Sequence, residues 1–109
     1  MTRLNLIQGT LDLIVLEVLT EQPLHGYGIA QRIQELSKRL LQVEEGSLYP
    51  ALYRMEKKGW IASEWGRTDT GRRARVYSLT AEGTVHLGQE RENWQAFSGA
   101  MKRIVGGRR

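Results

Sequence analysis

The sequence contains no cysteine, and this absence excludes several classes of protein. Without cysteine the chain has neither a disulfide framework nor a thiolate metal site. The only two histidines, His25 and His86, are far apart and have no local partner at metal-ligand spacing. No apolar run reaches the length of a membrane span, and the N-terminus lacks the basic-then-apolar layout of a signal peptide. We therefore expect a cytoplasmic protein without a metal or other cofactor.

The residue patterns of an active site are also missing. No glycine-rich loop of the phosphate-binding kind occurs, and no histidine stands at a useful spacing from a serine or a carboxylate. The chain has 109 residues, of which 40% are hydrophobic, enough for one domain with one modest core. The sequence gives no support for an enzyme, and we expect a binding protein.

Positive charge is present, but it is concentrated in one part of the chain. Residues 1–66 contain seven Lys/Arg and eight Asp/Glu, a net charge of −1, whereas residues 67–109 contain nine and four, a net charge of +5. The densest stretch is a glycine-containing segment with four arginines: Arg67, Arg72, Arg73 and Arg75. Because these charges repel one another, the cluster indicates a polyanionic partner. A solvated loop tip is the alternative, and it would be favoured if the segment stood alone.

Two amphipathic helices are predicted before residue 40. The first begins at Gly9 and ends at residues 21–23, and its apolar residues recur on one face: Leu11, Ile14, Val15, Val18 and Leu19. Leu13 and Leu16 fall on the opposite side, so this helix has apolar surface to bury in two directions. The second helix follows residues 25–28 and has a shorter buried row: Ile29, Ile33 and Leu36.

A third helix is predicted to open at residues 46–47. Ser47 is the expected N-cap, Pro50 falls in the first turn, where its missing N–H costs nothing, and Gly59 occupies the C′ position. Its core-facing row is apolar: Leu48, Leu52 and Met55. Its outer face carries aromatic and basic side chains instead: Tyr49, Tyr53, Arg54 and Lys57.

Two strands and a long helix complete the predicted order. Residues 60–65 and 74–79 indicate a β-hairpin whose turn is the arginine-rich segment, and Thr80 caps the last helix. This order predicts a mainly α winged helix-turn-helix with a β-hairpin wing. In such a fold the third helix enters the major groove of DNA while the wing reaches phosphates or the minor groove. The expected DNA-binding residues lie on these two elements: Ser47, Tyr49, Pro50, Tyr53, Arg54, Lys57, Arg67, Arg72, Arg73 and Arg75.

The last helix carries a second apolar stripe. Its residues follow a coiled-coil-like spacing that only Glu90 interrupts. The stripe could pack within its own domain, but the three preceding helices already complete a core, so we expect it to face a second copy. The expected dimer interface combines this stripe with the opposite side of the first helix: Leu13, Leu16, Leu87, Trp94, Phe97, Met101 and Ile104. Residues 1–80 would then form the DNA-binding domain and residues 81–109 the dimerisation helix, within one compact unit.

The remaining aromatic and histidine residues are assigned structural roles. Trp60, at the start of a strand, is expected in the core, and Trp65 is expected to anchor the base of the wing. His25 is expected to cap or hydrogen-bond locally. Tyr27 is expected to pack near the start of the second helix, with a phosphate contact as the alternative.

Four segments of the chain resemble the PadR family of transcriptional regulators. They are LHGYGI at 24–29, EGSLYPALYR at 45–54, EKKGWI at 56–61 and RRARVYSLT at 72–80, and the block GSLYPAL is the most specific. The resemblance covers residues 8 to about 100. It implies a homodimeric repressor in which the last helix supplies the interface and which binds a pseudo-palindromic operator. The chain is similar to the short branch of the family, without a large separate C-terminal domain.

Two alternatives stay open at this point. In similar dimeric regulators an aromatic residue on the final helix can stack on a flat ligand, so Trp94 either binds a small aromatic effector that releases the DNA or fills the dimer seam. Some winged helices are protein–protein interaction modules without operator binding. Those usually expose apolar or acidic residues on the third helix, whereas this one carries tyrosine, arginine and lysine.

Overall fold

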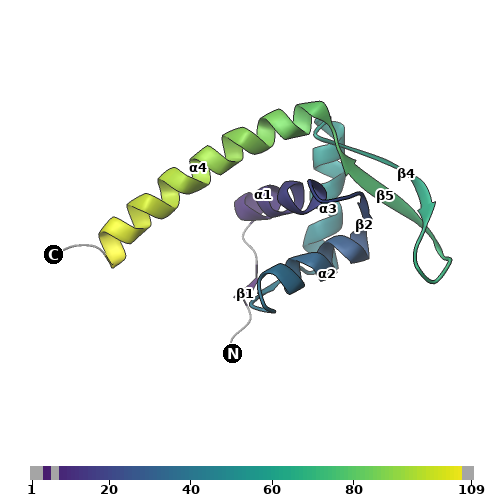
Figure 1. Ribbon diagram of the computed structural model, residues 1–109, viewed down its shortest axis with the longest axis horizontal. Coiled ribbons are helices and arrows are strands. Elements are labelled where there is room, and N and C mark those ends of the chain that lie inside the picture. The colour runs from purple at the N-terminus through teal and green to yellow at the C-terminus, as the bar shows by residue number, and fades with distance from the viewer. Residues whose placement is uncertain (1–3, 6–7, 107–109) are drawn as a thin grey trace.

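The computed structural model describes residues 4–5 and 8–106 of the chain. The elements follow in the order β1 (Leu4–Asn5), α1 (Gln8–Leu19), β2 (Leu24–His25), α2 (Gly26–Leu36), β3 (Leu41–Gln42), α3 (Glu45–Lys57), β4 (Ile61–Arg67), β5 (Arg73–Leu79) and α4 (Ala81–Val105). Figure 1 shows α1, α2 and α3 packed together, with the β4–β5 wing projecting on one side and α4 running out on the other. The predicted mainly α winged helix-turn-helix with a long last helix is confirmed.

The wing belongs to a sheet of three antiparallel strands rather than a hairpin alone. β4 and β5 pair from Ile61 opposite Leu79 to Arg67 opposite Arg73. The other edge of β5 pairs with β2, which gives the order β2-β5-β4 and attaches the wing to the start of α2. A separate parallel pair joins β1 to β3. The sequence did not predict β1, β2 or β3, because two residues are too few for an alternating pattern.

The core is shared by all four helices and the base of the wing. α1 lies at its centre and contacts α2, α3 and α4. The predicted inner row of α3 is confirmed, since Leu48, Leu52 and Met55 are buried. On α2 the row is shorter than predicted, because Ile29 and Ile33 are buried while Leu36 is 54% exposed.

Two residues expected at the dimer interface belong to this core instead. Leu16 is 0% exposed and Leu87 is 2% exposed, and both lie in the same buried cluster. The physical reason is that α4 contacts α1 within the chain. α4 therefore covers the side of α1 that was expected to face a second subunit. Leu13, on the same helix, is partly buried against that cluster.

The start of α3 also differs from the prediction. The helix begins at Glu45 with Glu44 as its N-cap, so Ser47 lies inside the first turn and is not the cap. Pro50 is consequently in the helix interior, where its missing N–H leaves one carbonyl without the usual helical bond. The end of α3 is as predicted. Gly59 has φ +83°, and the N–H of Trp60 donates to the carbonyl of Met55 at 3.0 Å, which forms a Schellman cap.

In the part of the chain that the structure describes, three contacts in the first half of α4 attach this helix to the body. The predicted cap is confirmed, because the Thr80 hydroxyl accepts from the N–H of Gly83 at 2.9 Å. One turn later the ring of His86 stacks on Trp60 with 3.6 Å between the ring centroids. Farther along, the guanidinium of Arg91 donates two hydrogen bonds to the carboxylate of Glu17 on α1. The C-terminal part of α4 extends past the body (Figure 1), and the molecule measures 56 × 34 × 22 Å.

Candidate nucleic-acid interface

A groove of about 830 Å³ separates the wing from the first turns of α2 and α3. Glu45 and Tyr49 line it from α3, and Tyr27 lines it from α2. The opposite wall is the wing, including Trp65 and the segment from Arg72 to Arg75. Residues far apart in the sequence therefore meet at one concave surface, because β2 ties the wing to the start of α2.

One face of the wing carries most of the arginines. Trp65 lies opposite Arg75, and Arg67 lies opposite Arg73 in the strand register. Paired residues, and residues two apart on a strand, share a face of the sheet. The side chains of Trp65, Arg67, Arg73 and Arg75 therefore lie on the same face, which borders the groove, while Arg72 lies at the tip of the wing.

The wing arginines are exposed, but their side chains are held to different degrees. Arg67 donates to the carbonyl of Gly71 at 2.8 Å, which closes the turn. Arg75 donates to the hydroxyl of Ser63 at 3.0 and 2.6 Å and lies 3.8 Å from a carboxylate oxygen of Glu56. The guanidinium of Arg73 lies 4.5 Å from the ring centre of Trp65. Among the described residues, the Arg72 side chain makes no hydrogen bond or ion pair.

The outer face of α3 presents aromatic rings. Tyr53 is 65% exposed, and the ammonium of Lys57 lies 5.3 Å from the centre of its ring. Tyr49 is 46% exposed and is packed against the start of α2. A Cβ at Gly26 would stand 2.7 Å from the Tyr49 hydroxyl, so the glycine allows the ring to lie against the backbone. Ser47 and Pro50 are exposed beside these rings.

Arg54 is not part of this exposed face, and its expected role is corrected. Its guanidinium donates two hydrogen bonds to Asp12 on α1, at 2.7 and 2.9 Å. These bonds raise the pKa of Arg54 above its ordinary value. The side chains of Arg54 and Asp12 are 31% and 14% exposed. Arg54 therefore joins α3 to α1, and it leaves the set of α3 residues that were expected to contact DNA.

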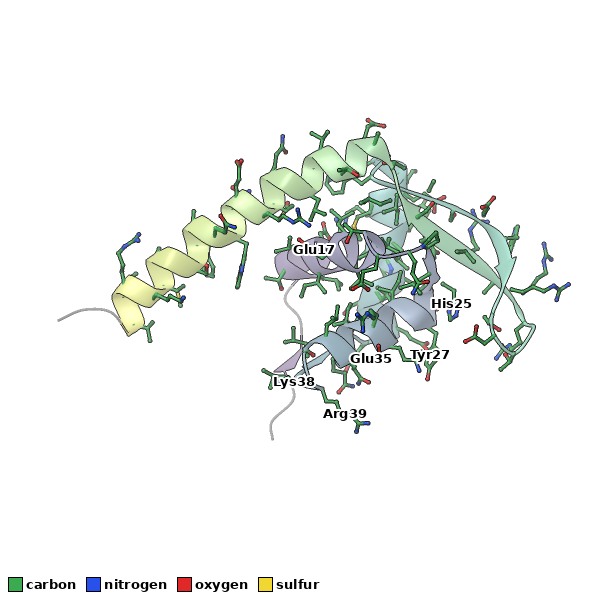
Figure 2. All side chains as sticks on the ribbon, in the orientation of Figure 1. Glu17, His25, Tyr27, Glu35, Lys38 and Arg39 are labelled. Carbon is green, nitrogen blue, oxygen red and sulfur yellow. The ribbon has the colours of Figure 1, made fainter. Side chains whose placement is uncertain are left out.

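The structure confirms the expected roles of some single aromatic and histidine residues and corrects those of others. His25 is a local cap, because its Nδ1 accepts from the N–H of Gly28 at 3.1 Å. Trp60 packs beside the core, but Tyr27 is exposed and lies parallel to the His25 ring. Figure 2 shows His25 and Tyr27 at the end of α2 nearest the wing. Trp65 is 56% exposed and does not anchor the wing base.

The apolar stripe on α4 stays exposed beyond Leu87. Trp94 and Phe97 form a tilted pair with ring centroids 6.1 Å apart, and each is about half exposed. Met101 and Ile104 continue the stripe and are 42% and 65% exposed. Nothing on the described part of the same chain covers these four side chains, in contrast to Leu87.

Residues 4–5 and 8–106 form neither a membrane-spanning helix nor a metal site. No helix there combines the length and the apolar composition that crossing a membrane requires. The same residues contain no group of three His, Asp or Glu side chains placed to hold a metal ion.

Known proteins are similar to this chain in sequence and in fold. Residues 15–89 match the family described as the transcriptional regulator PadR-like family. The transcriptional regulator Rv3488 of Mycobacterium tuberculosis is 34% identical over 100 residues, which cover 92% of this chain and 87% of that protein. A solved transcriptional regulator from Clostridium thermocellum has a TM-score of 0.83 at 33% identity, covering 91% of this chain and 96% of its own. A PadR family regulator from Clostridium difficile has a TM-score of 0.75 at 31% identity, covering 88% and 98%. The chain belongs to the PadR-like family of transcriptional regulators.

Proposed function

We propose that this regulator is a cytoplasmic, homodimeric repressor that binds a pseudo-palindromic DNA operator. The observation that carries the proposal is the groove between α3 and the wing. The exposed ring of Tyr49 lines its helix side, and exposed arginines line its wing side. The ring of Tyr53, one turn later on α3, is exposed as well. Such a surface matches a DNA strand at the border of a major groove, with base edges toward the helix and phosphates toward the wing.

The outer face of α3 and the wing have different roles in this proposal. Tyr49, Tyr53 and Lys57 would contact base edges or sugars in the major groove, with Ser47 and Pro50 beside them. The wing arginines would neutralise phosphates or enter the minor groove, because guanidinium groups suit phosphate oxygens. A protein–protein module is the less favoured alternative, since α3 exposes Tyr49, Tyr53 and Lys57 and the wing exposes four arginines.

The exposed stripe on α4 supports the dimer. Trp94, Phe97, Met101 and Ile104 form a row of large apolar side chains that a second copy of α4 would remove from water. Leu13 on α1, which was expected at the same interface, is partly buried against the core. In this proposal residues 1–80 supply DNA binding and residues 81–109 supply assembly, although Leu87 also completes the core and residues 107–109 lie outside the described part. Trp94 is about half exposed. The proposal includes a flat aromatic effector that stacks on Trp94 and releases the DNA.

The proposal is tested by footprinting the promoter region of the regulator's own gene. We expect protection of two half-sites related by two-fold symmetry and about one helical turn apart between their centres, or a multiple of it. Binding should weaken steeply as the salt concentration rises. Protein that binds this promoter and unrelated duplexes equally would contradict operator recognition.

A further inference from the structure

An exposed tryptophan on the wing lies against two arginines. The guanidinium carbons of Arg73 and Arg75 are 4.5 and 5.2 Å from the ring centre of Trp65, within the range of cation–π attraction. Trp65 itself is 56% exposed, so it contributes little to a core. The contacts that the structure records for the Trp65 ring are with these two guanidinium groups.

The ring of Trp65 is a larger part of the contacts that hold Arg73 in place than of those that hold Arg75. Arg75 is also held by the hydroxyl of Ser63 at 2.6 Å, with Glu56 at 3.8 Å. For Arg73, the ring of Trp65 is the side-chain contact that the structure records among the described residues. Removal of the indole would therefore release Arg73, whereas Arg75 would keep its hydrogen bonds.

We infer that Trp65 is a positioning residue for DNA binding, which holds the Arg73 guanidinium toward the groove before the phosphate backbone arrives. The inference rests on the proposed DNA-binding function of the wing. A free arginine side chain loses much rotamer freedom when it binds a phosphate. The ring restricts that freedom beforehand, and both Trp65 and Arg73 line the groove. The guanidinium can keep its face on the ring while its N–H groups point to phosphate oxygens.

The test is a double-mutant cycle on a duplex that the wild-type protein binds. Trp65→Leu should weaken binding about two- to fivefold, the range of one exposed cation–π contact. The same substitution should have almost no effect in an Arg73→Gln background, because the residue that Trp65 positions is then absent. In an Arg75→Gln background the loss should persist. Trp65→Phe keeps an aromatic face and should restore most of the affinity that Trp65→Leu loses.

Three outcomes would overturn the inference. They are unchanged binding by Trp65→Leu, an equal loss with and without Arg73, and no rescue by phenylalanine. Circular dichroism and thermal unfolding of each variant show whether the wing remains folded, which we expect because Trp65 is exposed. Wild-type protein that binds no duplex would contradict the proposed function itself. Normal wild-type binding with additive losses would contradict only the role of Trp65.

Discussion

The guanidinium of Arg54 donates two parallel hydrogen bonds to the carboxylate of Asp12, at 2.7 and 2.9 Å. The pair links α3 to α1 across 42 positions of the sequence. Bidentate pairs of this kind are among the strong hydrogen-bonded contacts that arginine forms with a carboxylate. The helix proposed to enter the major groove is thereby fixed to the centre of the core by a polar contact as well as by packing.

Arg54→Ala should therefore lower stability more than it lowers DNA affinity. The substitution leaves the largely buried Asp12 carboxylate unpaired, which costs on the order of 1–3 kcal/mol. Urea unfolding measures this loss, and Asp12→Asn combined with Arg54→Ala should recover part of it. A variant of normal stability with strongly reduced operator binding would show that Arg54 leaves Asp12 to contact DNA.

The wing arginines should control the salt dependence of binding. Replacing Arg72 and Arg73 with alanine should weaken binding to all duplexes similarly and reduce the salt slope by about 0.9 for each lost phosphate contact. Fluorescence titration at several salt concentrations gives this slope. The matched control is Lys38→Ala with Arg39→Ala, which removes two charges at the end of α2 opposite His25 and Tyr27 (Figure 2). An equal change of slope in the control would show that only net charge matters.

Tyr53 should contribute to sequence recognition. Tyr53→Ala is expected to cost roughly 1–3 kcal/mol on the operator and much less on random DNA, because the ring lies on the exposed face of α3. Competition titrations with both duplexes separate the two effects, and Tyr53→Phe shows whether the hydroxyl is needed. Equal losses on both duplexes would indicate that α3 only positions the protein.

The stripe on α4 should hold the dimer together. Phe97→Glu with Met101→Glu would place unpaired carboxylates in an apolar interface, at a cost of about several kcal/mol per ion. Analytical ultracentrifugation should show a folded monomer that has lost operator binding but keeps weak, salt-sensitive attraction to DNA. Val85→Glu is the control, because Val85 is 67% exposed on α4 but outside the stripe. A double variant that still sediments as a dimer would place the interface elsewhere.

Two glycines of α4 should respond to alanine in opposite ways. A Cβ at Gly83 would stand 1.9 Å from the carbonyl oxygen of Trp60, so Gly83→Ala must displace the start of the helix. We expect a loss of about 1–3 kcal/mol, as for other overpacked sites. Gly88 has open space around it, so Gly88→Ala should raise stability by up to about 1 kcal/mol through helix propensity. Thermal unfolding of the two variants tests this contrast, and equal effects would argue against the close contact.

Local signals in the sequence predicted local structure well. The positive φ at Gly59, the Thr80 cap and the buried row of α3 each depend on neighbouring residues, and all three were predicted. The start of α3 was misplaced, because a serine three residues into the helix has the same side chain as a good N-cap. The strand β2 was missed because it is too short for an alternating pattern and because its partner strand, at Tyr77, lies about 50 positions away.

Contacts between distant segments explain the errors at the candidate site. Helical periodicity puts Arg54 on the exposed face of α3, and no neighbouring residue in the sequence indicates its pairing with Asp12. Leu16 and Leu87 were assigned to the dimer interface because the sequence does not show that α4 packs against α1 in the same chain. The contact of Trp65 with Arg73 could have been inferred, since strand register places both on one face of the wing.

The attachment of α4 has a geometric consequence in the proposed dimer. The helix is held at His86 and Arg91, and about 21 Å of it lies beyond the second of these. A tilt of α4 by about 10° at Arg91 moves the C-terminal end of the helix by roughly 4 Å, which is more than the ~3.4 Å rise of one base pair. The Glu17–Arg91 pair therefore fixes the direction in which the rest of α4 extends. Substitutions there would change the half-site spacing that the two wings fit, without altering a residue that faces DNA.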